Sequence, residues 1–101
     1  MKTVDVLRKA RRILANPKRF CKGTAAMDAE GTFVRPMDPN AKKFDALGAI
    51  VRVGGGVLAL NAIHEAARDL YDRHVAVVND SYDGRRKVLR CFNHAIKNLR
   101  G

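Results

Sequence analysis

The chain of 101 residues is poor in aromatic side chains, which make up 6% of it and include no tryptophan. Hydrophobic residues nevertheless reach 47%, enough apolar surface for a packed core, so disorder is disfavoured. A core with few large rings must be built mainly from leucine, isoleucine, valine and alanine, which favours packed helices over a β-sandwich. A chain of this length has room for one core, so we expect a single domain over residues 1–101.

Long apolar runs are also missing. No stretch contains the ~20 consecutive apolar residues of a membrane-spanning helix, and Met1 leads directly into an amphipathic segment rather than the apolar core of a signal peptide. Cys21 and Cys91 are the only cysteines, and two thiols in a chain without a secretion signal are more often reduced than bridged. We therefore predict a cytoplasmic protein that does not contact a membrane.

Side chains suited to catalysis or metal binding are scarce. Ser81 is the only serine, and it stands where a helix cap is expected. The cysteines and histidines show neither the C-x-x-C nor the H-x-x-x-H spacing of a zinc site. Glu65, Asp69 and Asp72 have helical spacing but fall on an outer face, where solvated carboxylates are common. We therefore predict a protein that is not an enzyme and has no metal and no cofactor.

Hydrophobic periodicity and turn residues predict a mainly α fold of the α+β class, with about four helices around one core and a small β-hairpin. The predicted elements are a helix over 4–15, a β-hairpin over 23–36, a helix that begins at Asp38-Pro39 and stops at Gly54-Gly55-Gly56, a helix over 57–72, an apolar strand or buried connection over 75–78, and a helix over 82–99 capped by Asn79-Asp80-Ser81. The expected core contains Leu7, Leu14, Phe44, Leu47, Ile63, Leu70, Val88, Phe92 and Ile96.

Acidic residues are half as numerous as basic ones, and the net charge of +10 favours an anionic partner. Residues 1–22 contain eight basic residues and one acidic residue, a balance of +7. Residues 83–101 contain six and one, a balance of +5, whereas the sixty residues between contain six and eight, a balance of −2. The positive charge therefore belongs to the first and last predicted helices.

The candidate anion-binding residues come from these two ends. Chain ends often lie close together in small domains, so the two clusters could form one basic surface. Arginine outnumbers lysine in both, which suits bidentate contacts to phosphate or carboxylate groups. The candidates are Arg8, Arg11, Arg12, Arg19, Arg85, Arg86, Lys87 and Arg90. The competing interpretation is that the charge serves only solubility.

The glycine triplet is a second candidate. Gly54, Gly55 and Gly56 precede a predicted helix, whose free N–H groups could bind an anion, although the lysine and hydroxyl of a P-loop are absent. A plain interhelical turn explains the same residues. A helix-turn-helix is rejected, because the helix over 57–72 presents three carboxylates and one arginine, which disfavours entry into a phosphate-lined groove.

Turn and core residues along most of the chain resemble a family of small bacterial and phage proteins catalogued as a domain of unknown function. The shared residues are Leu7-x-x-Ala10-Arg11, Pro17, Phe20, Gly23, Ala26-x-Asp28-x-x-Gly31, Pro36-x-Asp38-Pro39-x-Ala41, Leu47-Gly48-Ala49 and Asn79-Asp80. Members often carry tryptophan near Phe20 and cysteine near Asp45, and this chain does not. The resemblance implies a fold outline and a phage or mobile-element context, but no activity.

These observations together predict a small basic binding protein that acts stoichiometrically on a nucleotide, a nucleic acid or an acidic protein surface. In a phage context it would counter host defence, either by sequestering a nucleotide immune signal or by masking a nucleic-acid or acidic protein surface of a defence complex. The alternative is a nucleic-acid-binding transcriptional or architectural regulator. Assembly into a homo-oligomer is left open.

Overall fold

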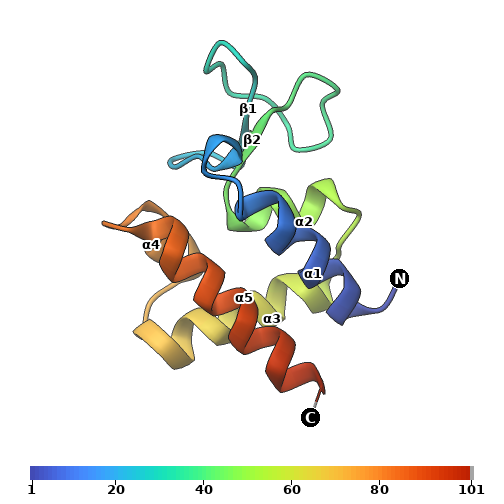
Figure 1. Cartoon of the computed structure of the whole chain (residues 1–101), viewed down its shortest axis with the longest axis vertical. Helices are drawn as coiled ribbons and strands as arrows, with labels where there is room; N and C mark the ends of the chain where they lie inside the picture. The colour runs from blue at the N-terminus through green and yellow to red at the C-terminus, as the bar shows by residue number, and fades with distance from the viewer. Residues whose placement is uncertain (101) are drawn as a thin grey trace.

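The chain forms α-helices along most of its length and one short antiparallel sheet, within residues 1–100, which this computed structural model describes (Figure 1). The elements are α1 (Thr3–Leu14), the 3₁₀ helix η1 (Pro17–Arg19), β1 (Ala26–Met27), β2 (Lys43–Phe44), α2 (Ala46–Arg52), α3 (Val57–Tyr71), α4 (Val75–Asp80) and α5 (Gly84–Arg100). The predicted mainly α fold with a small sheet is confirmed. The sheet and its loops project at one end of the helical layer (Figure 1).

Helices α1 and α5 pack against each other because each buries one apolar stripe. Leu7 and Leu14 of α1 and Val88 and Phe92 of α5 are fully buried in the same core. The two helices run antiparallel, since Arg85 in the first turn of α5 contacts Leu14 and Ala15 at the end of α1, while Asn93 further along α5 contacts Arg11, nearer the start of α1. Figure 1 shows them side by side, running in opposite directions.

The prediction of a β-hairpin over 23–36 is confirmed for the turn and wrong for the strand that pairs with β1. The Asp28 side chain accepts hydrogen bonds from the backbone N–H groups of Glu30 and Thr32, at 3.0 and 2.8 Å, and closes the expected turn. The returning chain makes only one bridge, between Met27 and Phe33. The ladder partner of β1 is instead β2, with Ala26 opposite Phe44, because a strand there places the Phe44 ring in the core.

The helix predicted to begin at Asp38-Pro39 begins at Ala46 instead. Asp38 caps only a turn, in which its side chain accepts from the Asn40 N–H at 2.7 Å. Asp45 is the helix cap, accepting from the Gly48 N–H at 2.6 Å. Both aspartates have suitable cap chemistry, and the burial of Phe44 in β2 selects the second.

Residues 75–78, predicted as a strand or buried connection, form the first turns of α4. The His74 ring caps this helix, its Nδ1 accepting from the Ala76 N–H at 3.1 Å. Asn79-Asp80-Ser81 ends α4 rather than capping the next helix, and α5 begins at Gly84, not at residue 82. The reason is that the Asn79 side chain turns into the core and is unavailable as a cap.

The predicted core is confirmed except at the end of α3. Six of the nine residues are fully buried, and Leu47 and Ile96 are partly buried against them. The prediction that Leu70 is buried is wrong, because 41% of its surface is exposed. It lies in the last turn of α3, where the helix borders an open groove beside α5.

Asn79 is the one polar side chain fully buried in residues 1–100. Its Oδ1 accepts from the Ala46 N–H at 3.0 Å, and its Nδ2 donates to the Cys21 carbonyl at 3.1 Å and to Asp80 Oδ1 at 3.0 Å. Asp80 belongs to α4 itself, but the bonds to Ala46 and Cys21 reach two other segments, so one amide joins α4 to the loop after η1 and to the start of α2.

Replacing Asn79 with alanine should destabilise the fold by about 2–4 kcal/mol, because the Ala46 N–H and the Cys21 carbonyl lose their buried partner. Asn79→Asp should be no better, since it removes the donor and adds charge beside Asp80. Urea unfolding followed by circular dichroism measures the change. Asn61→Ala, on the exposed side of α3, is the control and should stay within about 0.5 kcal/mol. Equal stability of the Asn79 and Asn61 variants would contradict the role of this amide.

Candidate anion-binding face

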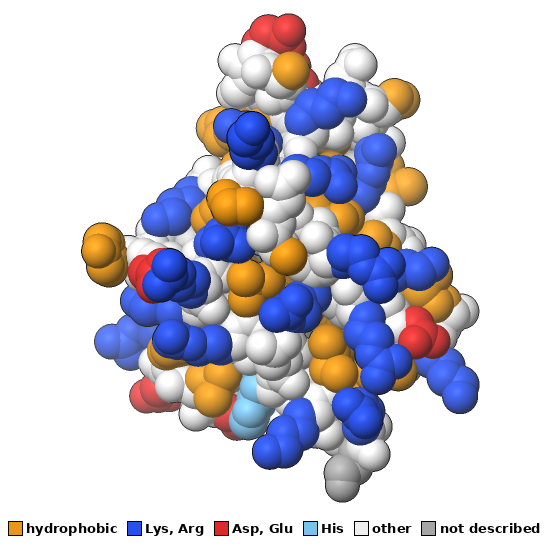
Figure 2. Space-filling model, viewed as in Figure 1, with side chains coloured by type: hydrophobic (Ala, Val, Ile, Leu, Met, Phe, Trp, Pro, Cys, Tyr) orange, Lys and Arg blue, Asp and Glu red, His pale blue; other side chains and the backbone are white. Residues whose placement is uncertain are grey.

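The packing of α1 on α5 brings the two predicted basic clusters onto one surface. In α5 five of the exposed residues fall three or four apart and form a single stripe: Arg86, Arg90, Asn93, Lys97 and Arg100. In α1 the exposed arginines are Arg8 and Arg12. We call six of the basic residues on these two helices the basic face: Arg8, Arg12, Arg86, Arg90, Lys97 and Arg100. Figure 2 shows lysine and arginine side chains spread across this side of the molecule, with few acidic groups among them.

Two of the predicted arginines form hydrogen bonds within the fold. Arg85 donates to the carbonyl oxygens of Leu14 and Ala15, at 3.3 and 3.1 Å, and so caps the C-terminal end of α1. A cation at a helix C-terminus also offsets the partial negative charge there. Arg11 Nε donates to Asn93 Oδ1 at 2.7 Å, a second tie between the two helices. These two guanidinium groups lie beside the basic face and hold it together.

Arg19 and Lys87 lie off the outer stripe. The Arg19 guanidinium stacks 5.5 Å from the centre of the Phe44 ring, as a cation–π contact next to the sheet. Lys87 is partly buried and its Nζ lies 3.3 Å from Ser81 Oγ. The structure therefore leaves Arg8, Arg12, Arg86 and Arg90 exposed on the outer sides of α1 and α5, whereas the other four candidates contact core or backbone groups or a neighbouring polar side chain.

Acidic groups near the basic face are few and placed at its border. Asp5 lies 3.4 Å from Arg8 and Asp83 lies 3.8 Å from Arg86, both one helical turn away in sequence. Exposed pairs of this kind contribute little and are screened by salt, so they leave the positive potential largely intact. The carboxylates of α3 are exposed as predicted, and Asp69 contacts His94 of α5 at 3.1 Å.

The glycine triplet forms a tight connection between α2 and α3. The N–H groups of Gly54 and Gly55 donate to the carbonyls of Val51 and Ile50, at 2.9 and 2.8 Å, and are not available to a ligand. A Cβ on Gly55 would approach Ile50 and Val6 to 2.6 Å, so close packing explains this glycine. Apart from Thr3 and the glycines, the adjacent groove is lined by apolar side chains, and its lining contains no arginine or lysine. Anion binding at Gly54, Gly55 and Gly56 stays a prediction without a neighbouring cation to support it.

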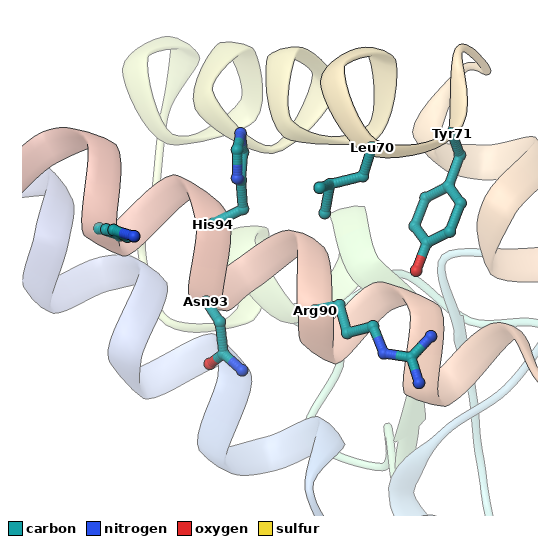
Figure 3. Close-up of a pocket in the computed structure, with 6 residues that line it drawn as sticks. Leu70, Tyr71, Arg90, Asn93 and His94 are labelled. Carbon is teal, nitrogen blue, oxygen red and sulfur yellow. The ribbon is translucent and has the colours of Figure 1, made fainter.

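A groove beside the basic face was missed by the sequence analysis. It has a volume of about 380 Å³ and lies between the end of α3 and the middle of α5 (Figure 3). Its lining residues are Leu70, Tyr71, Arg90, Asn93, His94 and Lys97. Hydrogen bonding with the Tyr71 hydroxyl raises the pKa of Arg90 above its usual value. The two helices come from distant parts of the chain, so no local pattern signals the groove.

The thiols and imidazoles do not assemble a reactive centre in residues 1–100. Both cysteines are free and buried, as expected for packing residues, and burial raises the pKa of each thiol to about 11. The rings of His64 and His74 meet edge to face with centroids 4.3 Å apart. No three potential metal-binding side chains come together anywhere in this described part of the chain.

Comparison with known proteins places the chain at the level of a family. A family profile matches residues 1–98. The chain belongs to DUF6197, a family of unknown function. No curated protein and no solved structure shows significant similarity to it. The membership confirms the resemblance to an uncharacterised family; DUF6197 lends no activity, and a bacterial or phage origin stays a prediction.

The helices of this DUF6197 chain are also informative about membranes. Across residues 1–100, none combines the length and apolar character required to cross a bilayer.

Arg85→Met should lower the free energy of unfolding by about 1–2 kcal/mol, because the carbonyls at the end of α1 lose a charged donor while the aliphatic stem is retained. Arg12→Met is the matched control, since Arg12 is exposed, and it should change stability by less than about 0.5 kcal/mol. Thermal and urea unfolding measure both. Equal stability of the two variants would remove the capping role of Arg85.

Cys21 and Cys91 should resist a thiol reagent in the native protein at about pH 8, because a pKa near 11 leaves on the order of 0.1% thiolate. Both should react at once after denaturation without reductant. Absorbance of the released chromophore counts the thiols. Rapid native labelling would contradict their burial, and no labelling after denaturation would reveal a disulfide.

Proposed function

We propose that this protein is a non-catalytic binding protein that occupies an anionic partner through the basic face. The observation that carries the proposal is the antiparallel packing of α1 and α5, which joins two basic clusters that are separate in sequence. Concentrating like charges costs self-repulsion, and a counter-charged partner relieves it on binding. A surface that served only solubility would mix both signs, as pairing along a helix favours.

The form of the basic face suits an extended or phosphate-rich partner. Its stripe on α5 runs from Arg86 to Arg100, a rise of about 21 Å at 1.5 Å per residue. Arg90 and Lys97 lie two turns apart between these ends, with Asn93 on the turn between them, so cations occur at both ends and within the stripe. Arginine predominates, and its planar guanidinium matches the two oxygens of a phosphate or carboxylate.

The absence of an enzymatic role is part of the same proposal. The Ser81 hydroxyl donates to the Val78 carbonyl at 2.6 Å and serves the end of α4. Cys21 and Cys91 are buried with raised pKa values, the opposite of an activated nucleophile. These local roles support action by stoichiometric binding rather than by turnover.

The basic face could bind one of several anionic partners, and each partner implies a different biological role. In the phage or mobile-element setting suggested by the family resemblance, the protein would counter host defence by sequestering a nucleotide signal or by masking a nucleic-acid or acidic protein surface. The alternative is a transcriptional or architectural regulator. Native mass spectrometry of protein purified from its host distinguishes them, because a retained nucleotide supports sequestration, and it reads any homo-oligomer at once. Binding to generic DNA that weakens steeply with salt supports the regulator.

Reversal of Arg8, Arg12, Arg86 and Arg90 to glutamate tests the basic face. Each reversal changes the charge by two, so the variant has a net charge of +2 in place of +10. We expect loss of activity in the native host, and of binding to inorganic polyphosphate, with the fold intact by circular dichroism. For the wild type, about five phosphate contacts would give log K against log salt a slope of roughly −3.5 on a single strand.

The matched control reverses four exposed basic residues elsewhere: Arg35, Lys42, Lys43 and Arg68. It has the same net charge as the test variant and should keep most of the binding. Full activity of the folded test variant would end the proposal. Equal losses in both variants would show that net charge, not the basic face, determines binding.

A further inference from the structure

The groove between α3 and α5 combines an apolar floor, one aromatic ring and two cations. Figure 3 shows Leu70 and Tyr71 extending from α3 toward α5, with the Tyr71 hydroxyl directed to the side of the groove where Arg90 lies. Lys97 stands two turns further along α5. The volume of about 380 Å³ falls within the range of about 300–1,000 Å³ found for small-molecule sites.

This set of side chains has the chemistry that recognises a nucleobase. Bases stack on tyrosine rings and arginine planes because every base has a π-face, and the apolar body of a base is compatible with Leu70. Leu70 is 41% exposed although it belongs to the apolar stripe predicted for α3. A planar ligand would cover this leucine, which the fold itself leaves open.

The groove is continuous with the basic face because Arg90 and Lys97 belong to both. A base in the groove would therefore have its sugar and phosphate beside these two cations. The carboxylate of Asp69 contacts His94 of the groove lining at 3.1 Å. The side-chain oxygen of Asn93, Oδ1, accepts a hydrogen bond from Arg11 Nε, so Asn93 does not offer this oxygen to a ligand.

We propose that the groove formed by Leu70, Tyr71, Arg90 and Lys97 is a nucleotide-binding site, in which Tyr71 stacks on the base while Arg90 and Lys97 bind the adjoining phosphate. The inference rests on the proposed function and narrows the anionic partner to one that carries bases. The nucleotide comes either free or as a unit of a single strand, and the recognition chemistry is the same in both.

The test compares Tyr71→Leu with Tyr71→Phe on three probes: single-stranded oligothymidylate, thymidine monophosphate and inorganic polyphosphate. Loss of the ring in Tyr71→Leu should weaken oligothymidylate binding about tenfold, whereas Tyr71→Phe keeps the ring and should stay within about twofold. Polyphosphate has no bases, so its affinity should not change in either variant. Fluorescence anisotropy at low salt gives the affinities of the polymers, and calorimetry gives that of the mononucleotide.

The outcomes separate this inference from the proposed function. If Tyr71→Leu weakens polyphosphate and oligothymidylate equally, or weakens neither, the nucleotide site is wrong, while polyphosphate binding that depends on the basic face leaves the proposed function standing. If the wild type binds none of the probes, both fail. Tyr71-dependent binding of the mononucleotide identifies a free nucleotide as the source, and dependence with the strand alone identifies nucleic acid.

A second measurement does not disturb the half-buried position 71 and decides the matter if Tyr71→Leu fails to fold. The chain has no tryptophan and two tyrosines, and Tyr82 is 91% exposed. In Tyr82→Phe, Tyr71 is therefore the only tyrosine fluorophore. Stacking should quench its emission when oligothymidylate or the mononucleotide is added, and polyphosphate should not. Unchanged emission at saturating oligothymidylate would overturn the inference.

Discussion

The buried amide of Asn79 positions the helix that carries most of the basic face. Two of its hydrogen bonds fix α4 against the start of α2 and the loop after η1. Gly84, the first residue of α5, sits directly on the Asn79 carbonyl, where any Cβ would collide with the backbone. The direction of α5 is thereby set at its first turn, and Arg85 then reaches the end of α1. The outer stripe of α5 follows from this junction.

Arginine has two roles in this molecule, in helix packing and on the exposed surface, so positive charge in the sequence does not by itself identify binding residues. Arg11 and Arg85 form hydrogen bonds between α1 and α5, while Arg8, Arg12 and Arg90 project into solvent. Both kinds come from the same clusters and have the same residue type. They differ in their distance to a backbone carbonyl or an amide oxygen, and that distance depends on how the two helices pack against each other.

Sequence periodicity predicted what local geometry controls: the amphipathic α1, α3 and α5, the buried Leu7 and Phe92, and the ends that carry positive charge. It failed where two residues were equally suitable, as Asp38 and Asp45 were as helix caps. There the burial of Phe44 in the tertiary structure selects Asp45 as the cap of α2. The groove depends on α3 ending beside α5, which brings residues 71 and 90 together. No pattern within one helix contains that information.

The close approach of Gly48 to the Ala25 carbonyl, and of Gly84 to the Asn79 carbonyl, has a consequence for how DUF6197 sequences vary. No other residue fits at these two positions, whatever the protein binds. Relatives with different partners would still share both glycines and the buried amide, while the exposed arginines could drift or change sign. The most constant positions in the family are therefore expected to be those required for packing of the helices. The residues that determine which partner is bound should be sought among the variable positions.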